Sequence, residues 1–354
     1  MCNKLTVAVV FGGQSSEHDV SCVSGATIMK ALNPEKYEMI LIGITKEGRW
    51  LLADSIKDVE SGAWENSRTQ AIISPDAGDG GIIFSEGERV WKKKVDVIFP
   101  VLHGMYGEDG TIQGLFELCR IPYVGCGVLA SSVSMDKIYT KIVVDTLNIR
   151  QARYVSVSHI EMRDVVKCAE KVEAALEYPV FVKPSKAGSS VGVNKAVDRE
   201  SLIRALEEAI KHDIHVLVEE TIVGREIECA VLGGYEPAAS DVGEVLSAEE
   251  FYTFDAKYNN AASKTDLHPV FPEGKLEEVR KDAVDIFRAL DGFGCARVDF
   301  FMEKDTNEVV FNEINTLPGF TSISMYPMLW NEKGLSNEAL VDRMIQHAFE
   351  RYAR

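Results

Sequence analysis

The residues best suited to chemistry lie together in the stretch CARVDFFMEKDTNEVVFNEINT, residues 295–316. Two β-like runs flank its polar turn, residues 304–307. A hairpin centred on Thr306 places Asp299 directly opposite Glu313. Two facing carboxylates destabilise a pair of strands unless a cation lies between them. The stretch therefore predicts a hairpin that binds a cation.

The same hairpin brings Arg297 opposite Asn315. Because side chains alternate between the two faces of a strand, both residues share the face of the two carboxylates, while Val298, Phe300 and Ile314 point to the other face. Carboxylates and an amide offer hard oxygen ligands, which suit Mg²⁺ or Mn²⁺ and not zinc. Such an ion usually completes its shell with water and nucleotide phosphates. The alternative interpretation is a solvent-facing pair of strands whose charges coincide by chance.

A loop of small residues is a candidate for phosphate binding. Lys183 ends the apolar run YPVFVKP, and the loop from Ser185 to Gly192 follows it. Backbone N–H groups in such a turn can wrap phosphate oxygens, and a lysine adds charge. The loop is not a Walker A motif, because GxxxxGK[ST] occurs nowhere in the chain. Taken alone it also fits an ordinary flexible hairpin, but Lys137, Lys257 and the acidic hairpin favour the phosphate hypothesis.

Strands alternating with helices are predicted for roughly the first 125 residues. A helix-like stretch runs from Asp19 to Leu32, and short β-like pieces fill residues 46–94. Buried strands are predicted at residues 5–13, 37–45 and 95–104. This order favours a mostly parallel α/β domain.

Two α+β segments are predicted to follow. The second segment opens with a helix of about twenty residues from Val128, and its later elements are a strand at 178–184, a return strand after the loop, a helix from 200 to 211 and a strand at 215–222. The third has strands at 226–233 and 295–314, a helix near 274–290, an irregular stretch from 316 and a final helix. We therefore expect domains at residues 1–127, 128–219 and 220–354.

The composition narrows the class of partner. A formal net charge of −17 disfavours a nucleic-acid partner, because phosphate backbones are bound by clustered Lys and Arg. Any anionic substrate must then be held by local cations. The apolar run from Leu5 to Phe11 is too short to span a membrane. Seven cysteines without metal-ligand spacing fit a reduced cytosol. We expect a cytoplasmic protein with no membrane or nucleic-acid partner.

Seven motifs, in one order along the chain, resemble those of the D-alanine–D-alanine ligases, members of the ATP-grasp family. They are FGGQSSEHDVS (11–21), LHGMYGEDGTIQG (102–114), SMDK (134–137), VKPSKAGSSVGV (182–193), DAKY (255–258), ARVDFF (296–301) and NEINTLPGFTSISMYP (312–327). The resemblance covers essentially the whole chain. It implies an α/β (α+β) fold of three domains, with an N-terminal parallel-sheet (preATP-grasp) domain and ATP clasped between the central and C-terminal domains. It also implies a homodimer.

The reaction implied by the resemblance joins two D-alanine molecules to D-alanyl-D-alanine for peptidoglycan synthesis. The carboxylate of the first D-alanine attacks the γ-phosphate of ATP and becomes an acyl phosphate. The amine of the second D-alanine then displaces phosphate through a tetrahedral intermediate. Phosphorylation thus supplies the leaving group that a free carboxylate lacks.

Catalytic and substrate-binding roles follow from the resemblance by matching motifs. Glu17 would hold the ammonium of the first D-alanine, in a hydrogen-bonded set with Ser189 and Tyr258. Arg297 would stabilise charge on the transferred phosphoryl group and on the tetrahedral intermediate, and the backbone N–H of Gly319 would complete an oxyanion hole. The second D-alanine would be bound by Ser324, the Met325 backbone and His103.

The resemblance also assigns the nucleotide and metal contacts. ATP phosphates would be contacted by Lys137, Lys183, Lys257 and the loop that carries Ser190. Adenine and ribose contacts would come from Glu219, Ile222 and Glu226. Two Mg²⁺ or Mn²⁺ ions that bridge the nucleotide would be bound by Asp299, Glu313 and Asn315. We further expect residues 248–266, which carry Lys257 and Tyr258, to close over ATP as a lid.

Three of these residues have a structural interpretation when taken alone. Glu17 is then an N-terminal helix charge favoured by the helix dipole. Tyr258 is a packed aromatic residue, and His103 is a structural histidine. The motif context favours the functional interpretation in each case.

The second substrate has three candidates, D-alanine, D-serine and D-lactate, because some ligases of this kind make D-alanyl-D-serine or D-alanyl-D-lactate. Tyr258 argues against D-lactate, since the depsipeptide makers generally lack this tyrosine. Met325 is similar to the residue of ordinary dipeptide ligases, whereas Tyr326-Pro327 resembles the serine ligases. Ile323 and Glu220 stand where the family commonly has His and Lys. D-alanine is the favoured second substrate, and D-serine is the alternative.

Two hypotheses come from other classes. A dinucleotide-binding oxidoreductase needs G-x-G-x-x-G after the first strand, but FGGQSSEHD lacks the later glycine. A non-catalytic module that kept the ATP-grasp fold is disfavoured by the intact Lys183, Arg297, Asp299 and Glu313.

Overall fold

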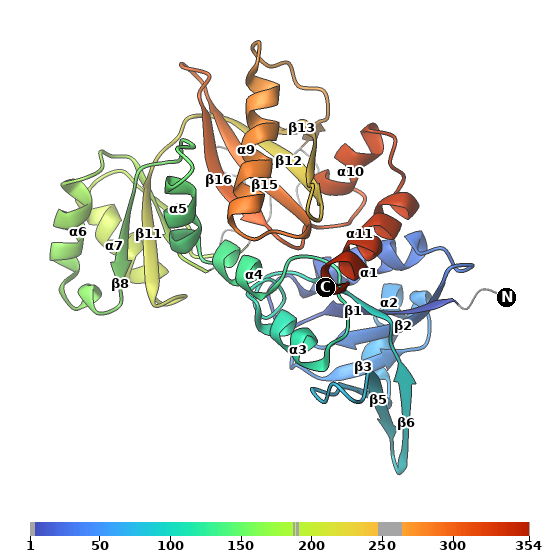
Figure 1. The fold of residues 1–354 in the computed structure, drawn as a ribbon. Coiled ribbons are helices and arrows are strands. Elements are labelled where there is room, and N and C mark those ends of the chain that lie inside the picture. The colour runs from blue at the N-terminus through green and yellow to red at the C-terminus, as the bar shows by residue number, and fades with distance from the viewer. Residues whose placement is uncertain (1–3, 187, 189–190, 247–263, 354) are drawn as a thin grey trace.

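The computed structural model describes residues 4–186, 188, 191–246 and 264–353. Within these residues it contains three β-sheets of seven, four and five strands, each with its own helices (Figure 1). This mixed α/β architecture confirms the predicted fold class. No helix in these ranges is both long and apolar enough to cross a membrane.

The first sheet is mixed, not mostly parallel as predicted, and its parallel part lies at one edge. Strand β1 pairs in parallel with β2 and β7, whereas the other neighbours pair antiparallel. The strand order is β6-β5-β4-β3-β2-β1-β7. The strands are β1 (Leu5–Gly12), β2 (Tyr37–Ile44), β3 (Trp50–Ala53), β4 (Gln70–Ile73), β5 (Gly81–Glu86), β6 (Arg89–Lys94) and β7 (Val97–Leu102). The short pieces predicted at 46–94 therefore extend the sheet with antiparallel strands. The connections from β2 to β3, β4 to β5 and β5 to β6 are too short for parallel crossovers, whereas the longer segment 54–69 joins β3 to β4.

Both faces of β1 are buried, and its side chains alternate between two cores. Val7, Val9 and Phe11 pack with the helices on one face, and Ala8 and Val10 pack with those on the other. The first face is covered by α1 (His18–Ala31), α2 (Ile56–Ser61) and the 3₁₀ turn η1 (Ala63–Asn66), and the second by α3 (Thr111–Cys119). An apolar run such as VAVVF is the expected sequence of a strand covered on both sides.

The second sheet is antiparallel and covered by helices on one face only. Its strands, in the order β10-β9-β11-β8, are β8 (Tyr154–Ser158), β9 (Val180–Pro184), β10 (Asn194–Ala196) and β11 (His215–Glu220). Val182 and Val218 pack with η2 (Glu161–Asp164), α6 (Val165–Glu173) and α7 (Arg199–Ala209). Because side chains alternate, the neighbouring Lys183 and Glu219 lie on the opposite face.

The third sheet is also antiparallel, and one part of it carries the charged residues. Its strands, in the order β14-β13-β12-β15-β16, are β12 (Gly224–Gly233), β13 (Ala238–Leu246), β14 (Lys264–Asp266), β15 (Gly294–Glu303) and β16 (Val309–Asn315). The side chains of Val298, Phe300 and Ile314 pack with helix α9 (Lys275–Ala289), as predicted for this face of the hairpin. The other face carries Arg297 and Asp299.

The predicted single helix from Val128 is wrong, because the structure contains two helices there. Helix α4 (Val128–Met135) ends before Asp136, whose backbone is extended (φ −91°, ψ 100°), and α5 (Lys137–Asp145) begins directly after it. The carboxylate of Asp136 accepts from the backbone N–H groups of Ile138 and Tyr139. An aspartate in this position caps a new helix more favourably than it continues the old one.

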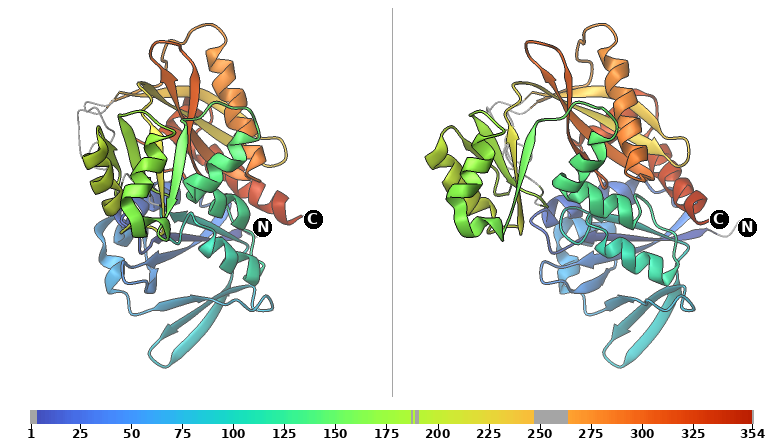
Figure 2. Two further views of the ribbon diagram at one scale, coloured as in Figure 1. Left: turned by 90° about the vertical axis from the view of Figure 1, so that its left-hand side faces the viewer. Right: turned by 60° about the vertical axis from the view of Figure 1, so that its left-hand side comes forward.

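Two further helices follow the third sheet, one of them inside the stretch predicted to be irregular. They are α10 (Met325–Glu332) and α11 (Asn337–Tyr352). Leu340, Met344 and Ile345 of α11 share one core with strand β1 and helix α1 (Figures 1 and 2). The chain after residue 336 therefore returns to the first sheet and joins it to the third.

Candidate active site

The acidic hairpin has the register that the sequence predicts. On β15 and β16, Arg297 pairs with Asn315 and Asp299 pairs with Glu313. The next pair is Phe300 with Phe311, so Asn312 is an extra residue on β16. Such a bulge re-aims the strand beside a site. The four polar side chains share one face, and this prediction is confirmed.

Arg297 is held as a fixed cation by two carboxylates. Its Nε and one terminal nitrogen donate to the two oxygens of Asp299 at 2.8 and 2.7 Å. Its Nε also lies 3.0 Å from a carboxylate oxygen of Glu228. Burial alone would lower the pKa of Arg297, but these acidic neighbours raise it well above its usual value. The guanidinium is therefore charged and fixed in orientation.

Glu228 is a site residue that the sequence analysis missed. It pairs with Asp299 across β12 and β15, and Asp299 pairs with Glu313 across β15 and β16. Three carboxylates therefore form a row over three adjacent strands. The signal was present in the alternation of GREIECAV, which puts Glu226 and Glu228 on one face of a strand. Without the pairing of β12 with β15, that face could not be assigned to the hairpin.

The hairpin offers a donor set that fits a divalent cation of the Mg²⁺ type. The side-chain amide of Asn315 donates to Asp299 at 3.0 Å, which leaves its carbonyl oxygen as a possible ligand beside the carboxylates. In the described ranges no group of three or more His, Cys, Asp or Glu is arranged to hold a metal by itself. Two carboxylates and an amide match an ion that takes its remaining ligands from water and phosphate.

Two lysines lie near this acidic row, Lys183 on β9 of the second sheet and Lys137 on α5, which packs on the core of the third sheet. The Nζ of Lys137 lies 3.7 Å from Glu313. The Nζ of Lys183 lies 2.6 Å from Glu219. Burial would lower the pKa of Lys183, but Glu219, Glu313 and Glu226 raise it. Lys183 of the second sheet and the carboxylates of the third sheet thus lie in one electrostatic cluster.

The cap of helix α5 positions Lys137 and the candidate phosphate loop together. The hydroxyl of Ser185 donates to Asp136, and the backbone N–H of Lys137 donates to the Ser185 carbonyl at 3.0 Å. Ser185 and Asp136 are both buried. The N-terminal end of α5 is therefore tied to the first residue of the loop that follows Lys183.

Glu17 lies at the point where the first sheet approaches this loop. It is the N-cap residue of α1. One carboxylate oxygen would lie 2.7 Å from a Cβ at Gly104 and 3.1 Å from a Cβ at Gly188. Any side chain at these glycines would meet the carboxylate. The glycines of two predicted motifs therefore allow Glu17 to lie between them.

His103 is buried and links the first sheet to the loop after β16. One ring nitrogen, Nδ1, lies 3.0 Å from the Leu317 carbonyl, and the other lies 3.3 Å from the hydroxyl of Ser24. Ser24 accepts from the backbone N–H of Phe320 at 3.1 Å. Burial lowers the pKa of His103. A neutral imidazole with its proton on Nδ1 satisfies all three contacts.

Glu108 is a second carboxylate that the sequence analysis did not assign. Its two oxygens accept from the backbone N–H groups of Gly104 at 2.8 Å and Leu317 at 3.1 Å. Burial, followed by the charge of Glu17, raises its pKa to about 8. Glu108 thus joins the loop after β7 to the loop after β16, next to Glu17.

The loop after β16 brings Gly319 next to Ser324. A Cβ at Gly319 would lie 2.9 Å from the Ser324 hydroxyl, so a side chain here would displace that hydroxyl. The same hydroxyl accepts from the backbone N–H of Thr321 at 2.9 Å. Met325 follows at the start of α10, and its side chain is 3% exposed and packs against Gly243. The side chain of Met325 is therefore part of the core.

Two more of the predicted site residues lie within the described ranges. Glu226 lies on β12 and contributes to the field at Lys183, and Ile222 lies between β11 and β12. Outside the described residues are Ser189, Ser190, Lys257, Tyr258 and most of the predicted lid, 248–266.

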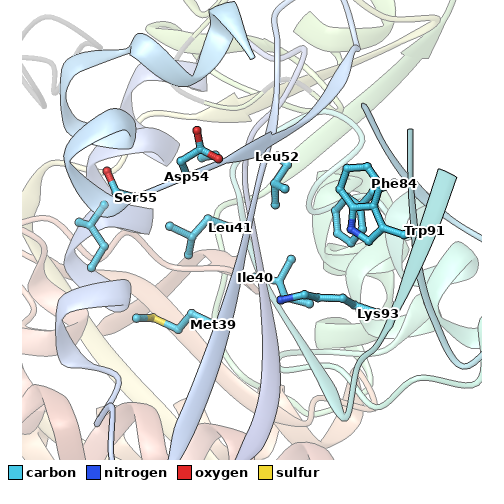
Figure 3. A pocket seen from close by; sticks show the side chains of 11 residues that line it. Met39, Ile40, Leu41, Leu52, Asp54, Ser55, Phe84, Trp91 and Lys93 are labelled. Carbon is cyan, nitrogen blue, oxygen red and sulfur yellow. The ribbon is translucent and has the colours of Figure 1, made fainter. Parts of the chain in front are cut away.

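A pocket beside the first sheet is separate from this cluster (Figure 3). Mostly apolar side chains line it, among them Leu41, Leu52, Phe84 and Trp91, together with Asp54 and Lys93. Among the residues that the structure describes, no predicted site residue contributes to its lining. This pocket and the charged cluster are therefore different features.

The arrangement defines the class of protein. Two α+β units, one carrying Lys183 and the other a row of carboxylates, meet at one cluster beside an α/β unit. This is the architecture of an ATP-grasp enzyme.

Comparison with known proteins identifies the family. The chain matches the family models described as D-ala D-ala ligase N-terminus over residues 6–126 and D-ala D-ala ligase C-terminus over residues 143–346. It is 51% identical to a D-alanine–D-alanine ligase of Acetivibrio thermocellus, over 99% of this chain and 98% of that protein. The chain belongs to the D-alanine–D-alanine ligase family, whose members use ATP and a divalent metal ion.

Solved structures agree with this assignment. The VanG D-Ala:D-Ser ligase from Enterococcus faecalis superposes with a TM-score of 0.89 at 36% identity, covering 98% of this chain and all of that chain. The D-alanine–D-alanine ligase from Coxiella burnetii gives a TM-score of 0.86 at 33% identity, with 99% and 95% coverage. The ATP-grasp fold predicted from the seven motifs is therefore confirmed.

Proposed function

We propose that the protein joins two D-alanine molecules to D-alanyl-D-alanine for peptidoglycan synthesis, with ATP as the phosphoryl donor. The observation that supports this proposal best is the cluster in which Lys137 and Lys183 face Arg297, Asp299 and Glu313. Cations on both sides of a set of hard oxygen ligands suit the transfer of a phosphoryl group.

In the first step, the carboxylate of the first D-alanine attacks the γ-phosphate. Glu17 binds the ammonium group of this substrate, together with Ser189 and Tyr258. Lys137 and Lys183 bind phosphate oxygens. The carboxylate–phosphorus bond forms as the bond to the leaving ADP breaks, and the product is an acyl phosphate.

The metal and the nucleotide are held by the residues predicted for them. Asp299, Glu313 and Asn315 would hold two Mg²⁺ or Mn²⁺ ions, which would neutralise phosphate charge that otherwise repels the attacking carboxylate. The base and ribose of ATP are bound by Glu219, Ile222 and Glu226, and its phosphates by Lys257 and the loop that carries Ser190.

In the second step, the amine of the second D-alanine attacks the acyl phosphate. Arg297 and the backbone N–H of Gly319 stabilise the oxyanion of the tetrahedral intermediate, and each such donor typically contributes about 3–4 kcal/mol. Ser324 and the Met325 backbone hold the carboxylate of the incoming substrate, near His103. Collapse of the intermediate releases phosphate and the dipeptide.

D-serine is the second candidate for the incoming substrate. The similarity to a D-Ala:D-Ser ligase at a TM-score of 0.89 favours it. Met325 is buried against Gly243 and gives no side-chain contact with which to distinguish the two substrates. D-alanine remains our proposal, because the D-alanine–D-alanine ligase of Acetivibrio thermocellus is 51% identical to the chain.

Three broader features belong to the same proposal. We expect a homodimer in the cytoplasm, with D-alanine as its small-molecule partner. We also propose domain boundaries after residues 127 and 219. Sedimentation of the purified protein tests the dimer, which would be contradicted by a single species of 39.2 kDa.

Phosphate release tests the reaction class. We expect release only when ATP, Mg²⁺ and D-alanine are present together. A protein that releases no phosphate under this condition is not a ligase for this substrate. An oxidoreductase would respond to none of the three compounds, and a non-catalytic module would bind ATP without turnover.

A further inference from the structure

Lys141 is a buried lysine to which neither the motifs nor the mechanism assigns a task. It lies on helix α5, one turn after Lys137, and is 1% exposed. Its Nζ lies 2.6 Å from one oxygen of Glu219 and donates to the Ala152 carbonyl at 3.3 Å. The ring of Tyr154 lies 5.3 Å from the same nitrogen. A lysine is almost never this buried unless it is paired.

Glu219 is shared between two lysines. Its first oxygen contacts Lys141, and its second lies 2.6 Å from Lys183. Burial would raise the pKa of Glu219, but the two lysines lower it to about 2. The carboxylate is therefore charged, and both of its oxygens have a fixed direction.

The sharing of Glu219 between two lysines affects how strongly Lys183 attracts a phosphate group. In a simple pair, the charge of Glu219 would cancel that of Lys183. Because Lys141 supplies a second positive charge to the same carboxylate, the three groups carry a net charge of plus one. Lys183 then keeps an attraction for anions, although it contacts a glutamate directly.

The sharing of Glu219 also affects which nucleotide base can bind. An ionised carboxylate can only accept hydrogen bonds. Held on both sides by lysines, Glu219 can accept from an exocyclic amine of a purine but would repel a carbonyl oxygen in the same place. Buried ion pairs rarely stabilise a fold more than packed apolar groups do, so a ligand-binding role explains the triad better than stability does.

We propose that Lys141 is a positioning residue for the nucleotide: it holds Glu219 for the amino group of adenine and leaves Lys183 free to attract phosphate. This inference rests on the proposed function, in which Glu219 and Lys183 contact ATP. It predicts an effect on the KM for ATP and on the preference for ATP over GTP, without an equal effect on D-alanine.

The experiment compares the steady-state kinetics of Lys141→Met, Glu219→Gln and the double variant with those of the unaltered chain. Lys171→Met is the matched control. Like Lys141, Lys171 contacts a carboxylate, that of Glu161 at 2.7 Å, and a backbone carbonyl at 2.8 Å. These contacts lie on the helix-covered side of the second sheet, away from Glu219. We expect Lys141→Met to raise the KM for ATP at least about tenfold and to reduce the preference for ATP over GTP. The KM for D-alanine and kcat should stay within about threefold, and the control should change none of these values.

The double variant tests whether Lys141 acts through Glu219. If it does, Lys141→Met adds less than about twofold to the KM for ATP once Glu219→Gln is present. This comparison holds even if Lys141→Met alone does not fold, because the double variant leaves no unpaired buried carboxylate. A full tenfold addition, or an unchanged KM for ATP in a folded Lys141→Met, would overturn the inference. If Glu219→Gln also leaves the KM for ATP unchanged, the proposed nucleotide site itself is wrong.

Discussion

Arg297 is the residue on which both chemical steps of the proposal depend. Its guanidinium is fixed by Asp299 and Glu228, so it can meet developing negative charge without reorganising. Arg297→Met should leave ATP binding nearly intact and lower turnover by at least about a hundredfold. Single-turnover kinetics and ATP titration measure the two effects.

Arg225 provides the control for this substitution. It forms a similar fork with Glu244, at 2.9 and 2.6 Å, on the opposite face of β12 from Glu226. Arg225→Met should retain nearly full turnover. Normal turnover in Arg297→Met, or an equal loss in both variants, would show that Arg297 has no role in transition-state stabilisation.

Glu108 gives a prediction about pH. Its pKa is raised to about 8 in the folded protein, above the ordinary value of 4.5, so the folded state binds this proton more tightly than the unfolded state. Stability from this group is therefore present below about pH 4.5 and is lost as the pH rises toward 8. Between pH 5 and 8, the Tm of the unaltered chain should fall by a few degrees relative to that of Glu108→Gln. Parallel Tm profiles for the two proteins would contradict the raised pKa.

Residue-scale prediction from sequence succeeded where neighbours in the chain determine the geometry. The facing pairs of the hairpin follow from alternation and from a turn centred near Thr306. Lys141, Glu108 and Glu228 were missed because their partners come from distant elements. A lysine four residues after Lys137 in a helix has no sequence feature that distinguishes a buried ion pair from a solvated side chain.

Helix α5 shows the same limit for whole elements. The composition of residues 128–145 favours helix throughout, and the prediction of one helix failed at Asp136 alone. Here the side chain competes with the backbone for the N–H groups of the next turn. The break matters because it places Lys137 at the start of a helix and beside Ser185.

Removal of this cap should affect both stability and nucleotide binding. Asp136→Ala should lower the free energy of unfolding by about 1–2 kcal/mol and raise the KM for ATP several-fold, since Lys137 and the Ser185 loop lose their common anchor. Denaturant unfolding and steady-state kinetics measure the two effects.

Asp198 offers a matched cap outside the site. It forms a capping box at the start of α7. Asp198→Ala should cost a similar amount of stability and leave the KM for ATP unchanged. Equal changes of KM in both variants would mean that any loss of helix stability, and not the position of Lys137, weakens ATP binding.

At the scale of the whole molecule, the net charge of −17 makes local cations essential. ATP is strongly anionic, so its binding must depend on a few lysines and on metal ions. The structure meets this requirement by bringing Lys137 and Lys183 to the acidic face of the third sheet. The sequence predicted these residues individually, but not that α11 would pack on the first sheet and join it to the third.

Product identification is the measurement that tests the central claim most directly. The protein is supplied with ATP, Mg²⁺ and D-alanine alone, and then with D-alanine plus D-serine or D-lactate, and the products are identified by mass. We predict phosphate release with D-alanine alone and the mass of D-alanyl-D-alanine as the main product in every mixture. A dominant D-alanyl-D-serine mass would contradict the proposed second substrate, and the absence of any ligated product would contradict the proposed function.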